Sequence, residues 1–136
     1  MRRALELVSG EGIGLYNNII ETLASLPELD GAGLHKQVDR LASTADTERL
    51  ELYLSLLLGL IERLIRHAAT GEGLIDQDEQ DIAKRLVSQN NLARWAEAWE
   101  AISEARDEAF ALNLDRSVLV LDAWFRLQQL AREHPV

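Results

Sequence analysis

Cysteine is absent from this sequence of 136 residues, and proline and aromatic residues are scarce, with two prolines and 5% Phe, Trp and Tyr. Without cysteine the chain has no disulfide framework, no thiolate metal site and no cysteine nucleophile. Basic residues are also few, since 14 Lys and Arg stand against 23 Asp and Glu, a net charge of −9. Binding to nucleic acid or to an anionic membrane depends mainly on Lys and Arg. We therefore expect the chain to bind neither on its own.

No apolar run is long enough to cross a membrane. The most apolar window, residues 52–61, ends at Glu62 and Arg63, and a membrane-spanning helix needs about 20 apolar residues. Near the N-terminus, Glu6 and the glycines that follow interrupt the apolar segment that a signal peptide requires. We expect a soluble, cytoplasmic protein.

The abundant feature is apolar residues at helical spacing. They make up 47% of the chain, and almost none alternate in twos as in a half-buried strand. The longest stripe, residues 46–70, is apolar over most of its circumference, which is typical of a helix buried on several sides. Residues 118–121 alone would fit a strand, but the flanking period favours helix. The prediction is an all-α fold, a compact bundle of about six helices around a long central helix.

The first residues differ from the rest of the chain. A short helical segment at 4–8 is followed by glycines at 10, 12 and 14. We therefore expect residues 1–12 to be the remnant of a preceding segment or a linker, and residues 13–136 to form the helical domain. Within that domain Asp30 and Asp76 are predicted N-caps, with Glu79 at the reciprocal position of a capping box after Asp76.

Residue patterns with catalytic or metal-binding spacing are missing. The acidic segment 76–80 lacks the glycine and the closing glutamate of a calcium loop. Neither glycine-rich segment, at 10–14 or 31–33, has the strand–loop–helix context of a phosphate-binding loop. The histidines share no two-ligand spacing; they are His35, His67 and His134. We expect no enzyme activity, no cofactor, no metal and no small-molecule substrate.

Three tryptophans remain to be explained. Trp95 and Trp99 lie one turn apart on one helical face, and Trp124 lies next to Phe125 in the last predicted helix. Core packing is one interpretation for each of them. Contact with a partner protein is the other, because tryptophan is enriched at interface hot spots. A third possibility is an unrelated ligand-binding or regulatory domain in which Trp95 and Trp99 line an apolar pocket.

Residues 109–130 resemble the closing helix of the delta-prime subunits of bacterial DNA polymerase III clamp loaders. That helix commonly starts with Asn-Leu-Asp/Asn-Arg and continues with a Val/Leu-rich run, and the matching residues here are Asn113, Leu114, Asp115 and Arg116. Residues 3–7 are similar to the Gly-Arg-Ala-Leu segment that closes the ATPase lid of those subunits, except that Arg2 stands where the family usually has glycine.

The resemblance implies a C-terminal collar domain, the all-helical bundle that joins clamp-loader subunits into a ring during sliding-clamp loading in DNA replication. The partners would be the collar helices of the other clamp-loader subunits, and residues 1–12 would be the end of the ATPase lid or a linker. The chain contains no Walker A sequence, no cysteine zinc module and no Ser-Arg-Cys segment. Any ATPase chemistry would therefore belong to other parts of the assembly.

The last two predicted helices are the expected association surface, because they combine apolar positions with arginines. The candidate interface residues are Trp124, Arg116 and Arg126, and Trp95 and Trp99 are candidates for either core or interface. Asn113 and Asp115 are expected to be structural residues that cap the final helix.

Overall fold

The computed structural model describes residues 10–42, 47–73, 76–113 and 115–136, and all its regular elements in these ranges are α-helices. The all-α prediction is confirmed, and residues 118–121 lie inside a helix. In chain order the helices are α2 (Gly10–Ser25), α3 (Gly31–Ala42), α4 (Thr47–Thr70), α5 (Gln77–Leu86), α6 (Leu92–Leu112) and α7 (Arg116–Glu133).

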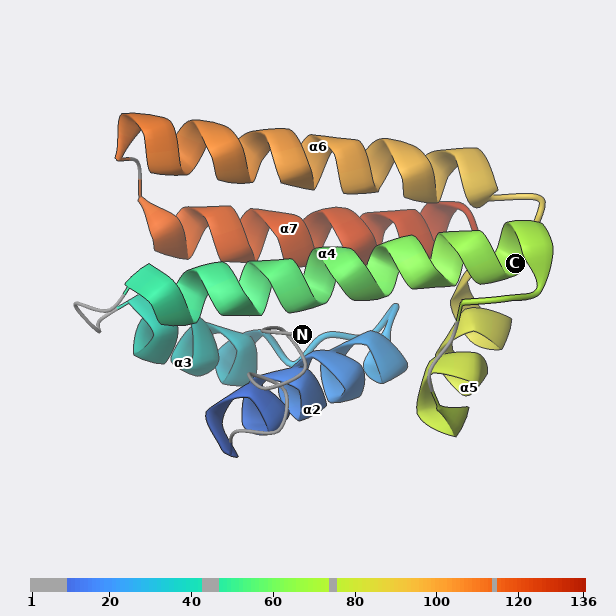
Figure 1. Ribbon diagram of the computed structural model, residues 1–136, viewed down its shortest axis with the longest axis horizontal. Helices are drawn as coiled ribbons and strands as arrows, with labels where there is room; N and C mark the ends of the chain where they lie inside the picture. The colour runs from blue at the N-terminus through green and yellow to red at the C-terminus, as the bar shows by residue number, and fades with distance from the viewer. Residues whose placement is uncertain (1–9, 43–46, 74–75, 114) are drawn as a thin grey trace.

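The long helix α4 is the centre of the bundle. It contacts α2, α3, α5 and α6, and Figure 1 shows it running beside α6, with α2 and α3 below it and α5 at one end. The apolar residues of α4 explain this position, because they occupy most of its circumference. Six of its residues have no exposed surface, namely Tyr53, Leu54, Leu57, Leu60, Ile61 and Leu64.

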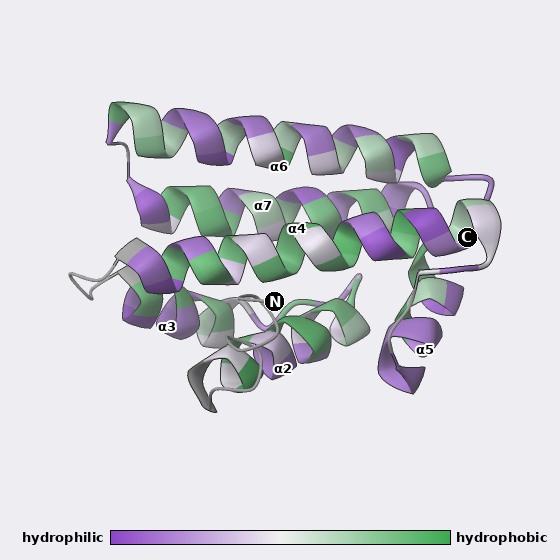
Figure 2. Cartoon of the chain, viewed as in Figure 1, coloured by the Kyte–Doolittle hydropathy of each residue, from purple (hydrophilic) through white to green (hydrophobic). Residues whose placement is uncertain are grey.

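Helix α7 forms an antiparallel hairpin with α6 and also packs against α3. Its buried side includes Val120, Trp124 and Leu127, all without exposed surface. Figure 2 shows alternating hydrophobic and hydrophilic bands along α6 and α7, as expected for helices that bury one side. By contrast, α5 is mostly hydrophilic.

The end of α2 is held by side chains from distant helices. The Arg85 guanidinium of α5 donates to the carbonyl oxygens of Ala24 and Leu26. From α7, the Gln128 amide donates to the Pro27 carbonyl oxygen at 3.0 Å. These bonds satisfy carbonyl groups that have no partner within α2 once the helix ends.

The predicted domain boundary after residue 12 falls inside a helix. Helix α2 begins at Gly10 and runs without a break through the glycines into the buried residues Leu15 and Ile19. Glycine lowers helix propensity by about 1 kcal/mol, but tertiary packing of the residues that follow outweighs this cost. Residues 10–12 thus belong to the helical domain, whereas the predicted helical segment at 4–8 and the lid-like segment at 3–7 lie outside the described residues.

Asn113 does not cap the start of the last helix. It ends α6 in the left-handed conformation, with φ of 54°, and its N–H bonds to the Ala109 carbonyl oxygen. Asparagine tolerates this conformation better than most residues. Asp115 is the N-cap of α7, as predicted, and its carboxylate accepts from the Ser117 N–H at 2.9 Å.

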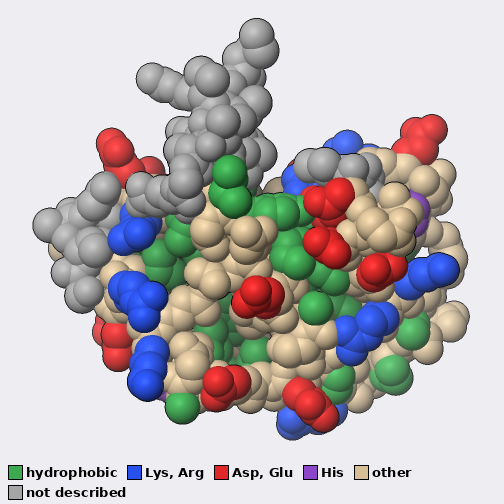
Figure 3. Space-filling model, turned by 90° about the horizontal axis from the view of Figure 1, so that it is seen from below, with side chains coloured by type: hydrophobic (Ala, Val, Ile, Leu, Met, Phe, Trp, Pro, Cys, Tyr) green, Lys and Arg blue, Asp and Glu red, His purple; other side chains and the backbone are tan. Residues whose placement is uncertain are grey.

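The lower face of the molecule, where α2, α3 and α5 lie, carries acidic and basic side chains interspersed, with apolar side chains between them (Figure 3). Among the described residues, no helix combines the length and hydrophobicity needed to cross a bilayer.

Candidate functional site

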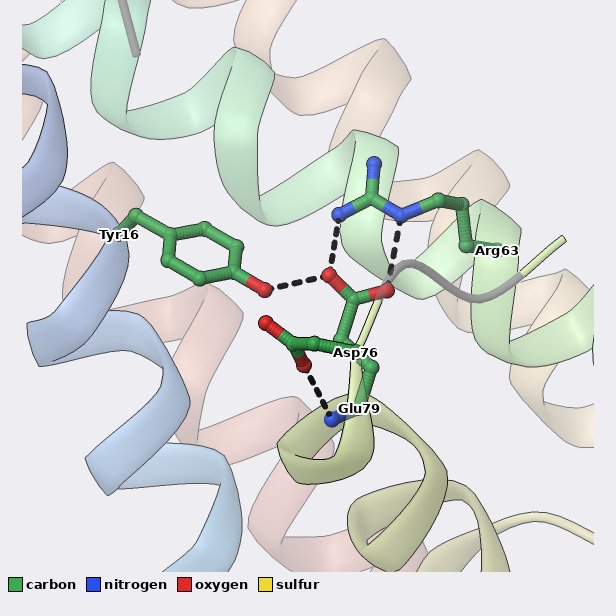
Figure 4. A network of polar contacts seen from close by, with 4 residues as sticks. All are labelled: Tyr16, Arg63, Asp76 and Glu79. Carbon is green, nitrogen blue, oxygen red and sulfur yellow. Dashed lines mark hydrogen bonds and ion pairs between the residues drawn. The ribbon is translucent and has the colours of Figure 1, made fainter. Parts of the chain in front are cut away.

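A buried carboxylate connects three helices at one end of the bundle. Glu79 of α5 has no exposed surface. Its carboxylate makes two parallel bonds of 3.0 Å with the Arg63 guanidinium of α4 and accepts a further bond from the Tyr16 hydroxyl of α2. Figure 4 shows the Glu79 carboxylate between these two donors. We call Tyr16, Arg63, Asp76 and Glu79 the Glu79 cluster.

Local sequence places Glu79 at this position. Asp76 caps α5 as predicted, because its carboxylate accepts from the Glu79 N–H at 3.0 Å. The cap fixes the first turn and therefore the direction in which the Glu79 side chain leaves the helix. Glu79 shares its helix face with Ile82, Ala83 and Leu86, which are also buried. The carboxylate consequently enters the interior together with the apolar side chains.

The environment of Tyr16 keeps its hydroxyl protonated. Partial burial raises the pKa of Tyr16, and the hydrogen bond to Glu79 and the negative charge of Glu79 raise it further. The Tyr16 hydroxyl therefore donates a hydrogen bond to the Glu79 carboxylate. A carboxylate with no exposed surface that accepts bonds from both an arginine and a tyrosine is suited to holding helices together.

Sequence analysis did not identify the Glu79 cluster. The signal that was available is the spacing of Glu79, Ile82, Ala83 and Leu86 at positions i, i+3, i+4 and i+7, which puts an acid on an apolar face. A charged residue on such a face is seldom buried without a partner. That spacing predicts a buried pair, but it does not name Arg63 or Tyr16 as the partners.

Two of the predicted interface tryptophans are core residues. Trp95 and Trp124 have no exposed surface. The Trp95 indole donates to the Leu86 carbonyl oxygen at 3.1 Å, and the Trp124 indole donates to the Tyr53 hydroxyl at 2.8 Å. Their area is buried and their N–H groups are bonded inside the chain. The core alternative therefore holds for Trp95, and Trp124 is a core residue instead of the interface residue that was expected.

Trp99 is only partly buried, and it packs against the core. Its indole N–H donates to the Leu58 carbonyl oxygen of α4 at 3.0 Å, which fixes the ring across the α4–α6 contact. An apolar pocket lined by Trp95 and Trp99 would have supported the ligand-binding alternative. Trp95 has no exposed surface and the Trp99 indole is bonded to α4. These two rings therefore pack in the contact between α4 and α6 and do not line a pocket.

The two predicted interface arginines remain near the surface. The Arg116 guanidinium lies over the Phe110 ring, 5.2 Å from its centroid, a cation–π geometry that joins α7 to α6. The Arg126 side chain is 47% exposed and forms an ion pair with Asp122 one turn earlier, at 3.7 Å. An exposed pair of this kind adds little stability, which leaves the Arg126 guanidinium accessible to a partner.

Exposed apolar side chains gather on the same two helices. Leu112 is 62% exposed, Val118 60% and Phe125 45%. Beside Phe125 a hollow lies between α6 and α7, lined on the α6 side by Ala98 and on the α7 side by Asp122 and Arg126. We call Leu112, Val118, Phe125 and this hollow the α6–α7 surface. It contains Arg126 from the predicted interface set but none of the tryptophans.

Among the described residues, no group of three or more histidine or acidic side chains is placed to hold a metal ion. The two candidate features of the structure are the Glu79 cluster inside the bundle and the α6–α7 surface outside it. No family model, curated protein or solved structure matches this chain.

Proposed function

We propose that this chain is a protein-association domain, and that its most specific role is that of a clamp-loader collar of the delta-prime type. The observation that carries the proposal is the exposure of Val118 and Phe125 on a helix whose opposite side is fully buried. An apolar side chain held on a rigid helix and left open to water gains free energy when a partner covers it, about 25 cal/mol for each Å² of apolar surface removed from water.

The specific form of the proposal depends on fewer residues. It is supported by Asn113, Asp115 and Arg116 at the junction of α6 and α7, where the sequence resembles the delta-prime subunits, and by the exposed apolar residues on α7. Arg126 lies in that surface and supplies a polar contact beside the apolar ones. Interfaces commonly combine an apolar centre with arginine in this way.

The test is association with clamp-loader subunits. The chain is mixed with the purified collar domains of the other subunits and its mass is followed by size-exclusion chromatography with light scattering. We expect a complex of the summed mass, and its loss when Phe125→Asp is introduced. Separate elution of the wild-type chain from all these collar domains would refute the clamp-loader role.

A matched control uses the exposed Glu51 of α4. Glu51→Lys changes a surface charge far from α7 along the chain, and we expect complex formation to persist. If Glu51→Lys abolishes the complex as fully as Phe125→Asp does, the association does not use the α6–α7 surface.

A further inference from the structure

A small hollow lies where α2, α3 and α4 meet. Helix α4 packs against both α2 and α3, which lie below it in Figure 1. The hollow measures about 180 Å³. Pockets for drug-sized ligands measure about 300–1,000 Å³, whereas one water molecule takes about 30 Å³. The hollow therefore has room for a small ion with a few water molecules.

The lining of the hollow is partly apolar and partly basic. Leu15 of α2 and Leu41 of α3 are buried and form its apolar part. Four polar side chains line the rest, namely Asn18, Gln37, Arg40 and Arg49. The two arginines carry a permanent positive charge. The described residues that line the hollow include no acid, although the chain has 23 acidic residues.

These polar side chains are rich in hydrogen-bond donors. Arg40 and Arg49 each take part in another interaction, but a guanidinium has five N–H donors, so it can bind a ligand while it keeps another contact. The Gln37 Nε2 is buried and has no hydrogen-bond partner among the described residues. A buried donor without an acceptor is unfavourable. A ligand with several acceptor oxygens would therefore suit the hollow.

We propose that this hollow binds a phosphate group, either as the free ion or at the end of a phosphomonoester. A phosphate group carries a charge of about −1.5 to −2 near neutral pH and has three strong acceptor oxygens. Its charge balances the two guanidiniums, and its oxygens accept from Arg40, Arg49 and Gln37. Arginine suits this role because its planar fork can donate two parallel bonds to a phosphate.

The site is unlike a phosphate-binding loop. The glycine-rich segment 10–14 lies inside α2, so the phosphate is bound by side chains from three helices and not by loop backbone. Gly14 contributes open space, since a Cβ added there would meet no other atom within 4 Å. None of the described lining residues belongs to α6 or α7. The inference is therefore independent of the proposed association role.

Two alternatives fit the charges less well. A carboxylate ligand has one negative charge and two oxygens, so it balances only one of the two arginines. Gln37 also lines a second hollow, between α2 and α3, but that hollow contains Glu21 and Asp30. These acids repel an anion. Phosphate in the hollow of Arg40 and Arg49 is the better match.

The test is a titration of the full, isotope-labelled chain with sodium phosphate, followed by nuclear magnetic resonance. Ionic strength is held constant because salt screens the charges. We expect the Gln37 side-chain amide signals to move and to reach saturation, together with the backbone amide signals of Asn18 and Arg49. Acetate, the carboxylate comparison, should bind at least about tenfold more weakly.

A parallel titration with glycerol phosphate distinguishes the two sources of the phosphate group. Binding at least as tight as that of inorganic phosphate identifies a phosphomonoester as the ligand. A preference for inorganic phosphate identifies the free ion. Either result supports a phosphate site in the hollow.

Paired substitutions test the arginines. Arg40→Gln with Arg49→Gln should weaken phosphate binding at least about tenfold, because both charge-assisted contacts are lost. Arg66→Gln with Arg132→Gln removes the same total charge at exposed sites on α4 and α7. This control pair should change phosphate binding less than about twofold.

Gly14→Leu fills the hollow without changing a charge. Leucine has a higher helix propensity than glycine, so the variant should fold, and circular dichroism checks that it does. We expect phosphate binding to weaken at least about tenfold, because the new side chain occupies the space of the ligand. Gly31→Leu is the control, since Gly31 also has open space beside it but does not line the hollow.

Four results would overturn the inference. They are a Gln37 side-chain amide that does not respond to phosphate, acetate binding as tight as that of phosphate, equal weakening by the two arginine pairs, and unchanged binding in folded Gly14→Leu. The association role is decided separately by co-elution with collar domains, so the failure of one proposal leaves the other standing.

Discussion

Helices α5 and α7 are attached to the rest of the bundle by different kinds of interaction. Most of the inner side of α7 is apolar, with Val120, Trp124 and Leu127 fully buried. Helix α5 is shorter and mostly hydrophilic (Figure 2), and it enters the interior with Glu79 as well as apolar residues. One helix is held mainly by burial of apolar surface, and the other depends on a charge-assisted cluster.

Substitutions should affect the attachment of α7 and the attachment of α5 differently. Apolar burial has no preferred direction, and cores tolerate hydrophobic replacements of similar volume. A buried ion pair is directional, and removing one partner leaves the other polar group without its bond. We therefore expect damage to α7 to unfold the whole bundle and damage to the Glu79 cluster to release α5 first.

Trp124→Ala should have the largest effect on stability. Removing the indole leaves a cavity between α7 and α4 and deprives the Tyr53 hydroxyl of its donor, at a cost of about 3–5 kcal/mol in the free energy of unfolding. Urea unfolding followed by circular dichroism measures it. Phe125→Ala is the matched control at the next, exposed position, and it should cost under about 1 kcal/mol. Equal losses for the two variants would contradict the placement of Trp124 in the core.

Glu79→Ala should have the next largest effect, and a more local one. The Arg63 guanidinium and the Tyr16 hydroxyl lose their common acceptor, which costs about 3 kcal/mol for a buried pair broken on one side. Hydrogen exchange should accelerate in α5 while α7 keeps its protection. Asp78→Ala, at the preceding exposed position, is the control and should leave the exchange of α5 nearly unchanged. Uniform acceleration in all helices would show that the cluster does not act locally.

The two N-caps allow a smaller comparison. The Asp76 carboxylate caps α5 by accepting from the Glu79 N–H, and the Asp115 carboxylate caps α7 by accepting from the Ser117 N–H. Each replacement by alanine should cost about 1 kcal/mol. Asp76→Ala should also increase exchange throughout α5, because a short helix depends on its cap. Asp115→Ala should affect only the first turn of α7. The opposite pattern would mean that α7 is the less firmly packed helix.

The smallest effect at neutral pH concerns the two tyrosines. Burial raises the pKa of Tyr53, and burial together with Glu79 raises the pKa of Tyr16. Because the folded chain keeps protons that the unfolded chain releases above about pH 10, stability is complete below that pH and falls as the pH rises further. The limiting loss is about 1.4 kcal/mol per pH unit for each tyrosine.

Urea unfolding at several alkaline pH values measures this slope, and the tyrosinate absorbance should appear together with unfolding. Tyr16→Phe and Tyr53→Phe should each remove about half of the slope. Tyr16→Phe tests the contact of α2 with α5, and Tyr53→Phe tests that of α4 with α7. A folded protein that shows full tyrosinate absorbance near pH 10 would contradict both assignments.

Local sequence signals predicted the features that depend on neighbours within one turn. The helical stripes and the Asp76 cap follow from spacing along the chain, and the structure has them. The sequence could not decide between core and interface for Trp95, and it placed Trp124 and Asn113 differently from the structure, for a common reason. A tryptophan in an apolar stripe has the same spacing whether its ring meets the core or a partner, and an asparagine between two helices suits the end of one as well as the start of the next.

The sequence by itself determined an all-helical chain with one helix apolar enough to be central, because apolar residues three and four positions apart are enough to indicate a helix. Only the tertiary structure decided which polar groups meet. Tyr16 and Glu79 are 63 positions apart and Trp124 and Tyr53 are 71 apart, so no local pattern links them. Helices α3 and α6 pack against α7 and leave its outer side uncovered. Val118 and Phe125 lie on that side and are therefore exposed.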